Sequence, residues 1–339
     1  KSIRHWEVQL IGNGRWCVAL GGRDCSLQRH EQKLIEFSLS EETLKGKDLD
    51  TLKLLQKDAV KFGEAVGLDS VSTYEAIVNT QDHRHFFMEM NTRLQVEHRV
   101  SELLYGLRFN IEGQTLYVDN LIHIMSLLAV YGHHLPEPEL VPKHKFSLEV
   151  RINAMNKALK PAPGGLIQHW SQPHAHEIRD DQGISKLNPD TGYAMPYFIS
   201  GAYDSNLALS LVAGQSYKSC IAQMLQVLNI MHISGRQVET NRESLLGMLA
   251  VIQSRQFHWN AGNAFSTAWV GQYLILAAQL QSLLTEAKLH HLNPHRVIVW
   301  ALTGEEAMLW SLPGCLDPAA KESLLLLLND FNIINKIQP

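Results

Sequence analysis

A ten-residue segment combines polar side chains that could bind a metal ion and an anion. It reads Glu89-Met90-Asn91-Thr92-Arg93-Leu94-Gln95-Val96-Glu97-His98. In an extended strand, successive side chains point to opposite faces. One face would then hold two carboxylates, a guanidinium and two amides, from Glu89, Asn91, Arg93, Gln95 and Glu97. The opposite face would be apolar, so the pattern predicts a strand with a core side and a chemically active side.

The preceding segment predicts a hairpin that brings two glutamates together. Residues 72–78 are typical of a strand, and the polar link 79–84 is typical of a turn. A symmetric antiparallel pairing places Glu75 opposite Glu89. Facing carboxylates are destabilising unless one is protonated or a cation lies between them. With Asn91 as a neutral oxygen ligand, the group suits Mg²⁺, which takes one or two carboxylates together with substrate phosphates.

Bulk composition narrows the class of protein. The 339 residues are enough for two or three domains, and 45% hydrophobic with 19% charged residues is ordinary for a globular protein. A net charge of −4 gives no reason to expect nucleic acid or a membrane surface as partner, and no run is long enough to span a membrane. Four scattered cysteines without a CxxC motif favour reduced thiols, hence the cytoplasm, or the mitochondrial matrix in a eukaryote.

The elements expected around this segment alternate between strands and helices. Strands are predicted at 4–11 and 16–20, a helix from about 40 to 66, and helices at 103–107 and 120–130. The charged run 23–36 is most simply a loop that ends in a strand-like piece, and 135–142 is expected to be a linker. A second unit follows, with strands at 146–153, 166–170, 176–179 and 207–212 and helices at 218–230 and 241–252. Beyond residue 261 the sequence is helical and apolar.

Five motifs, in order, resemble the C-terminal two-thirds of biotin carboxylase, the ATP-grasp component of biotin-dependent carboxylases. The resemblance covers roughly residues 1–270. Its motifs are Arg4-His5-Trp6-Glu7-Val8-Gln9, Arg23-Asp24-Cys25-Ser26-Leu27-Gln28 with Gln32-Lys33, residues 89–98, Glu149-Val150-Arg151-Ile152-Asn153-Ala154, and Tyr203-Asp204-Ser205.

The resemblance implies an α+β fold. We expect the C-terminal half of an ATP-grasp domain at 1–135, the C-terminal α+β domain of biotin carboxylase at 143–270, and a helical tail or inter-domain linker at 271–339. The first residues lack a Met and are expected to continue an upstream segment that carries the glycine-rich ATP lid. The chain alone is therefore expected to be inactive or very weak.

The resemblance also assigns roles on the metal and nucleotide side of the site. Glu75 and Glu89 match the family's Mg²⁺ (or Mn²⁺) ligands, with Asn91 assisting. His5 matches a histidine that contacts ATP, and Gln28 lies in the same nucleotide region. These roles agree with the metal site that the hairpin predicts.

On the bicarbonate side, the resemblance implies a pocket formed by Lys33, Arg93, Gln95 and Val96. Glu97 matches the general base that deprotonates bicarbonate as it attacks ATP. Arg151 matches the arginine that stabilises the enolate of biotin, which a carrier domain delivers. An arginine suits anions of this kind because its planar fork binds two oxygens at once.

Three departures from the family put parts of this assignment in doubt. Glu31 stands where the family has a nucleotide-facing histidine, and would repel phosphates unless it turns away. Arg99 replaces the proline that usually follows Val-Glu-His. Residues 110–118 look like an insertion of about ten residues.

Several alternatives remain open. The chain could belong to another ATP-grasp ligase, such as a carbamoyl phosphate synthetase, or to a catalytically impaired scaffold. The expected partners are biotin carrier and carboxyltransferase domains or subunits, the upstream part of the same enzyme, and a second copy in a homo-oligomer. No Ala-Met-Lys-Met biotinylation motif occurs, and the acyl acceptor cannot be inferred.

Overall fold

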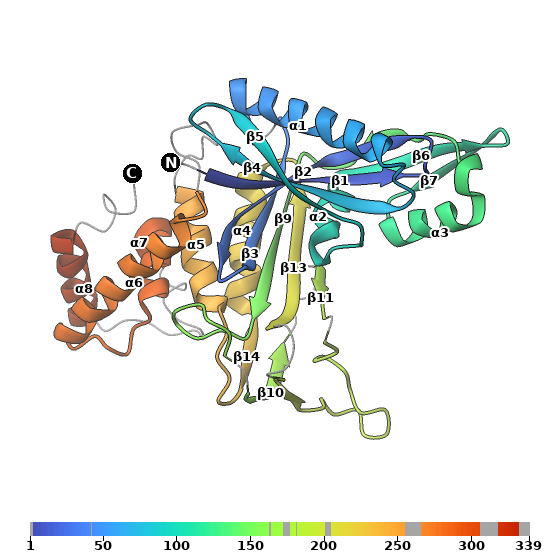
Figure 1. Cartoon of the computed structure of the whole chain (residues 1–339). Helices are drawn as coiled ribbons and strands as arrows, with labels where there is room; N and C mark the ends of the chain where they lie inside the picture. The colour runs from blue at the N-terminus through green and yellow to red at the C-terminus, as the bar shows by residue number, and fades with distance from the viewer. Residues whose placement is uncertain are drawn as a thin grey trace.

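An eight-stranded antiparallel sheet forms the centre of the molecule (Figure 1). The computed structural model describes residues 3–41, 43–162, 164–171, 177–180, 182–200, 205–254, 266–305 and 318–331. The strand order is β11-β13-β9-β3-β2-β1-β4-β5. Its strands are β1 (Ile3–Gly12), β2 (Cys17–Arg29), β3 (Gln32–Leu39), β4 (Val71–Asn79), β5 (Arg84–Asn91), β9 (Phe146–Asn153), β11 (Glu177–Arg179) and β13 (Asn206–Gly214).

Two smaller three-stranded sheets flank the central one. The first has the order β7-β6-β8, from β6 (Tyr105–Ile111), β7 (Gln114–Val118) and β8 (Glu139–Pro142). The second has the order β12-β10-β14, from β10 (Leu166–Ser171), β12 (Tyr197–Phe198) and β14 (His232–Arg236). In Figure 1, β10 and β14 lie at the opposite end of the molecule from α1 (Gly46–Ala65).

Helices cover the central sheet. On α1, the stripe of Leu52, Leu55 and Ala59 is buried against β1 and β2, as its spacing predicts. The remaining helices are α2 (Arg99–Leu104), α3 (Leu121–Tyr131), α4 (Tyr217–Ile230), α5 (Arg242–Ser254), α6 (Trp269–Glu286), α7 (Pro294–Thr303) and α8 (Pro318–Phe331), with the 3₁₀ turns η1 (Val96–His98) and η2 (Gly132–His134). No helix among the described residues combines the length and the apolar character that crossing a membrane requires.

The helical tail packs on the rest of the chain. Leu280 of α6, Val297 of α7 and Leu324 of α8 are buried in the same core as α4, α5 and the sheet. Thr267 N donates a hydrogen bond to Ile3 O, so the segment before α6 is also attached to β1. The apolar composition beyond residue 261 therefore reflects packing within this chain.

The structure corrects several local predictions. The helix expected at 103–107 ends at Leu104, and β6 begins at Tyr105. The apparent insertion at 110–118 is the hairpin of β6 and β7, and part of the expected linker at 135–142 is strand β8, which pairs with β6. The helix expected from residue 40 begins at Gly46. Of the Tyr203-Asp204-Ser205 motif, only Ser205 lies within the described residues.

The pairing of β3 with β9 joins the two halves of the sequence. Ile35, Glu36 and Phe37 lie opposite Val150, Glu149 and Leu148. The central sheet therefore continues from the segment expected to be ATP-grasp into the segment after residue 143. The division into three units stays a prediction.

Candidate active site

The hairpin of β4 and β5 has the predicted register. Glu75 is paired with Glu89, and the pairing shifts at the next position because Met88 is an extra residue in β5. Glu75 is buried and Glu89 is exposed. The side-chain nitrogen of Asn91 lies 2.6 Å from Glu75 Oε1 and 3.2 Å from Glu89 Oε1, so one amide is hydrogen-bonded to both carboxylates.

The predicted continuous strand from Glu89 to Glu97 is wrong. β5 ends at Asn91, and the chain bends before the 3₁₀ turn η1. Arg93 is therefore exposed, whereas Glu97 is buried. Within the described residues, Arg93 has only a 3.4 Å hydrogen bond from its Nη1 to Leu94 O, and it does not reach Glu97.

Glu97 lies between two cations. Its Oε2 accepts a hydrogen bond from Arg151 Nη2 at 2.6 Å, and its Oε1 is ion-paired with Lys33. Lys33 is also ion-paired with Glu7. Burial alone would raise the pKa of Glu97, but the charges of Lys33 and Arg151 bring that pKa below its ordinary value. Glu97 is therefore ionised at neutral pH, as a general base must be.

Arg23 is hydrogen-bonded to residues that surround this site, a role that the sequence interpretation missed. It is fully buried, and its Nη2 donates to Glu7 Oε2 at 2.9 Å and to Gln95 Oε1 at 2.8 Å. Its Nη1 donates to Gln9 Oε1 and Ser101 Oγ. The run expected to be a charged loop is strand β2, and the alternation of Glu7 with Gln9 on β1 was the available signal for buried polar partners.

His5 connects Gln28 to the predicted metal ligands. Its Nε2 is 2.8 Å from Glu75 Oε2, and Gln28 Nε2 is 3.3 Å from its Nδ1. Burial lowers the pKa of His5, but the hydrogen bond to Glu75 and the charges of Glu7 and Glu75 together outweigh it, and the pKa is raised. Gln95 Nε2 donates to Glu75 Oε1 at 2.8 Å, which links this group to the residues around Arg23.

The metal ligands predicted from the sequence form a set of oxygen donors that suits a hard cation. Glu75 and Glu89 each direct one oxygen at the Asn91 amide, and Glu89 is open to solvent. Because amide oxygen and nitrogen are distinguished only by their hydrogen bonds, a flipped Asn91 would offer Oδ1. A second group with ligand atoms close together is His5, Glu7 and Glu75, and it shares Glu75 with the first.

The two unusual residues of the sequence lie away from Glu97's carboxylate. His30 and Glu31 form the two-residue turn between β2 and β3, both with positive φ, and both are exposed. Arg99 begins α2 and is ion-paired with Glu102 at 3.3 Å. The carbonyl of Val96 accepts a hydrogen bond from Arg179 Nη1 at 2.9 Å, which fixes the start of η1 to β11.

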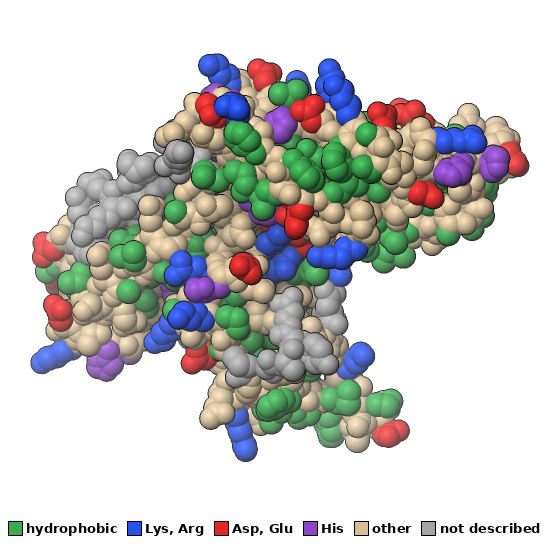
Figure 2. All heavy atoms as spheres, in the orientation of Figure 1, with side chains coloured by type: hydrophobic (Ala, Val, Ile, Leu, Met, Phe, Trp, Pro, Cys, Tyr) green, Lys and Arg blue, Asp and Glu red, His purple; other side chains and the backbone are tan. Residues whose placement is uncertain are grey.

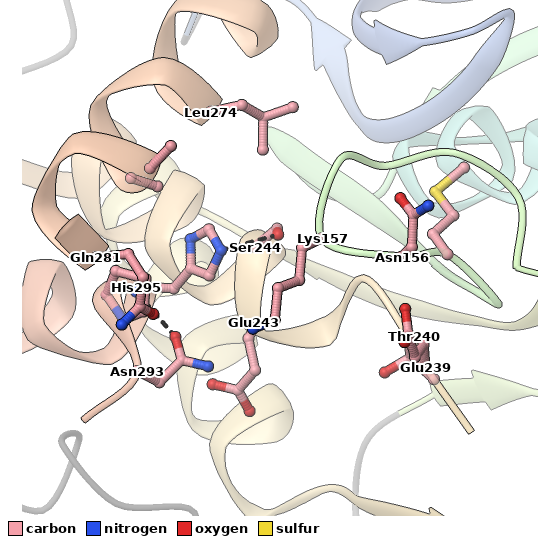
Figure 3. A pocket seen from close by; sticks show the side chains of 14 residues that line it. Asn156, Lys157, Glu239, Thr240, Glu243, Ser244, Leu274, Gln281, Asn293 and His295 are labelled. Carbon is pink, nitrogen blue, oxygen red and sulfur yellow. Dashed lines mark hydrogen bonds between the residues drawn. The ribbon is translucent and has the colours of Figure 1, made fainter. Parts of the chain in front are cut away.

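A separate cavity of about 430 Å³ lies between α5, α6 and α7 (Figure 3). None of the predicted site residues lines it. His295 is buried there, with Ser244 Oγ 3.2 Å from its Nε2 and Tyr273 Oη 2.7 Å from its Nδ1. Burial lowers the pKa of His295 to about 4, so it is a neutral, hydrogen-bonded core histidine.

Figure 2 shows acidic and basic side chains close together near the middle of one face, where the upper and lower parts of the molecule meet. The mixed charge on this face does not indicate a field of one sign.

Known proteins resemble this chain in sequence. Residues 1–113 match the family "Carbamoyl-phosphate synthase L chain, ATP binding domain". The chain is 34% identical over 239 residues to biotin carboxylase 1 of Bacillus subtilis, which covers 69% of this chain and 47% of that protein. It is 35% identical over 236 residues to the methylcrotonoyl-CoA carboxylase alpha subunit of rice, covering 68% of this chain and 28% of that protein. The chain belongs to the biotin carboxylase family.

Solved biotin carboxylase structures share its fold. The biotin carboxylase domain of a thermophilic 2-oxoglutarate carboxylase, bound to bicarbonate, superposes with a TM-score of 0.61 at 26% identity, covering 80% of this chain and 54% of that chain. The Kluyveromyces lactis urea carboxylase gives a TM-score of 0.57 at 27% identity, covering 73% of this chain and 20% of that chain. The chain thus spans about half the length, or less, of the biotin carboxylase relatives and domains that it matches.

Proposed function

We propose that this chain is the biotin carboxylase part of a biotin-dependent carboxylase, which carboxylates biotin N1 with ATP and bicarbonate through carboxyphosphate. The observation that carries the proposal is Glu97, an ionised and buried carboxylate between Lys33 and Arg151. A bicarbonate ion that entered this region would meet a base and two cations.

In the first step, Glu97 accepts the proton of bicarbonate while a bicarbonate oxygen attacks the γ-phosphorus of ATP, and ADP leaves to give carboxyphosphate. Lys33 and Arg93 hold the anion, Lys33 from the buried side and Arg93 from the exposed bend. Gln95 and Val96 shape the pocket between them. Arg93 must move toward Glu97 to take this role, since it is exposed here.

Glu75, Glu89 and Asn91 would hold Mg²⁺ or Mn²⁺ on the nucleotide side of the site. The ion supplies positive charge that neutralises the phosphates during transfer. His5 and Gln28 orient the nucleotide, and the hydrogen bond of His5 to Glu75 ties that role to the metal side.

In the second step, carboxyphosphate breaks down to CO₂ and phosphate, the phosphate takes the N1 proton of biotin, and N1 then bonds to the CO₂. Arg151 stabilises the negative charge that develops on the ureido oxygen when N1 has lost its proton. Arg151 must then divide its hydrogen bonds between biotin and Glu97. Asn241 fixes its backbone, because Asn241 Nδ2 donates to Arg151 O at 2.8 Å.

The class of carboxylase, its partners and its location are assigned from the relatives. The relatives include methylcrotonoyl-CoA, propionyl-CoA and urea carboxylases. We assign an acyl-CoA type carboxylase, in which a carrier domain brings biotin and a carboxyltransferase uses the product, with a homo-oligomer in the cytoplasm or mitochondrial matrix. Within the 339 residues no glycine-rich loop with paired lysines occurs, so these residues alone should turn over little ATP.

The direct test uses the protein purified from its natural host with its partner segments. Labelled bicarbonate, ATP, Mg²⁺ and free biotin should give acid-labile label on biotin, and each omission should abolish it. A protein that binds Mg·ATP but never labels biotin would overturn the proposal.

A second candidate is a carbamoyl phosphate synthetase-type ligase, which the matching family over residues 1–113 favours. It predicts ammonia-dependent formation of carbamoyl phosphate and no effect of biotin. The same reaction mixture with ammonia in place of biotin separates the two candidates, and a catalytically impaired scaffold would show neither product.

A further inference from the structure

Two buried glutamates face each other beside Arg151. Glu36 on β3 is the register partner of Glu149 on β9. Glu36 is 1% exposed and Glu149 is 0% exposed. Directly opposed side chains of antiparallel strands have Cβ atoms about 4.5–5.5 Å apart, and like charges at such positions are destabilising.

The hydrogen bonding of this pair does not suit two ionised carboxylates. Among the described residues, neither carboxylate oxygen of Glu149 has a hydrogen-bond donor, and Oε1 of Glu36 has none. Glu36 Oε2 accepts only from the thiol of Cys25, at 3.3 Å. Buried carboxylates without donors are costly, whereas a carboxylic acid can donate to its neighbour.

The charges connected to the pair also indicate that its two carboxyl groups are not both ionised. Ion pairs within 4 Å run from Arg23 through Glu7, Lys33 and Glu97 to Arg151, which is 3.5 Å from Glu36 Oε1 and 3.9 Å from Glu149 Oε1. These members are three cations and four carboxylates. From Glu7 the series also continues to His5, at 3.7 Å, and from His5 to Glu75, at 2.8 Å, which adds one carboxylate and at most one cation. The series therefore has at least one more carboxylate than cation, and one proton on the glutamate pair offsets one negative charge.

The other charged groups around the pair do not remove the need for that proton. Arg179 approaches from β11, but its side chain is half-buried and its Nη1 is hydrogen-bonded to Val96 O. His5 on β1 is hydrogen-bonded to Glu75. Burial keeps the pKa of the Cys25 thiol well above its ordinary value, so Cys25 donates and adds no charge.

We propose that Glu36 and Glu149 share one proton at neutral pH and thereby act as a positioning pair that leaves Arg151 bound to Glu97. The role of Arg151 toward biotin rests on the proposed function, but the shared proton does not. Burial, followed by the charge of Glu97, raises the pKa of Glu36 to about 7. Burial, followed by the charge of Glu36, raises the pKa of Glu149 well above its ordinary value.

Loss of this proton would place a second full negative charge beside Arg151. The guanidinium would then be drawn toward Glu36 and Glu149, in competition with Glu97 and with the enolate of biotin. The pair would therefore limit carboxylation on the alkaline side without touching a substrate.

Infrared difference spectroscopy on the folded chain tests the shared proton without any need for turnover. At about pH 6, where ordinary glutamates are ionised, wild type should show the carbonyl-stretch band of one protonated carboxylic acid. The double variant E36Q/E149Q should lose this band, because no carboxyl group is left at the pair. E31Q, at an exposed glutamate, should keep it. A wild type without the band, or a band that survives in E36Q/E149Q, would overturn the proposal, and circular dichroism confirms that each variant is folded.

The pH dependence of labelled biotin formation by the full protein tests the positioning role. Wild type should lose activity above neutral pH, and in E149Q this loss should be absent, because its single carboxylate, once ionised, carries no more charge than the singly protonated pair. An alkaline limb at the same pH in both proteins would refute the positioning role. If no biotin is labelled at any pH, the proposed function fails while the infrared result still decides whether the proton is shared.

Discussion

The buried and exposed parts of the candidate site differ in how completely their charges are paired. Glu97, Lys33 and Arg151 are buried or nearly so, and each is ion-paired within the chain. Glu89 and Arg93, a few residues away, are exposed, and Arg93 has only one long hydrogen bond among the described residues. The base and its cations are thus preorganised, whereas Glu89, assigned to the metal, and Arg93, assigned to the anion, are open to incoming ligands.

This difference indicates that folding constrains the charges of the buried part, whereas ligand binding constrains those of the exposed part. Charges in the buried part must be balanced for the chain to fold, because burying an unpaired charge costs several kcal/mol. Charges in the exposed part are solvated by water, so leaving them without a ligand costs little free energy of folding. Substitutions should therefore affect stability in the first part and ligand binding in the second.

The largest expected effect is on Arg23. R23M removes hydrogen bonds to Glu7 and Gln95 in the interior and should lower the free energy of unfolding by about 3–5 kcal/mol. R108M is the matched control, because Arg108 and Glu139 form an exposed pair whose loss should cost less than about 1 kcal/mol. Urea denaturation of both variants measures the free energy of unfolding. Equal losses in R23M and R108M would contradict the claim that buried charges matter more for stability than exposed ones.

Buried His98 should make the protein acid-sensitive. Burial lowers its pKa from 6.5 to about 4, so the unfolded chain takes up the proton first as the pH falls. The free energy of unfolding should decrease between about pH 6.5 and 4, by up to about 3 kcal/mol from this residue. H98Q should show a shallower dependence, and an unchanged pH slope in H98Q would contradict this assignment.

Glu89 should affect metal binding with little effect on stability. Changes to partners outside the direct ligands already weaken metal binding roughly 10–100-fold, so E89Q should weaken Mn²⁺ binding at least roughly tenfold. The exposed Glu112, in the turn between β6 and β7, provides the control variant E112Q. Calorimetric titration of Mn²⁺ with nucleotide into the full protein measures the change, and unaltered affinity in E89Q would remove Glu89 from the metal site.

The smallest effect is expected at Asn241, which joins α5 to β9. Its Oδ1 accepts from Asn153 N and its Nδ2 donates to Arg151 O, both at 2.8 Å. N241A should cost about 1–3 kcal/mol and raise KM for biotin more than it lowers kcat, because Arg151 loses its support. N188A removes comparable bonds in an exposed turn and should leave KM unchanged.

Local patterns predicted the hairpin well. A symmetric pairing of the two predicted strands around the polar turn places Glu75 opposite Glu89, as observed, although the bulge at Met88 shifts the pairs nearer the turn by one residue. The alternation of polar and apolar residues failed beyond Asn91, since period-two spacing cannot show where a chain bends into the interior. Glu97 was identified through the family resemblance, while its burial depends on that bend.

Contacts between distant segments could not be read from the sequence. Glu36 and Glu149 are more than a hundred residues apart, and only the pairing of β3 with β9 brings them together. Arg23 was assigned to a charged loop because buried arginines are rare unless paired. Its partners Glu7 and Gln95 come from two other elements.

Bicarbonate-dependent ATP hydrolysis by the full protein, compared between wild type and E97Q, tests the central claim most directly. If Glu97 is the preorganised base, E97Q should lose roughly 10²–10⁴-fold of this activity while binding Mn²⁺ and nucleotide as wild type does. Bicarbonate-dependent hydrolysis at the wild-type rate in E97Q would contradict the account.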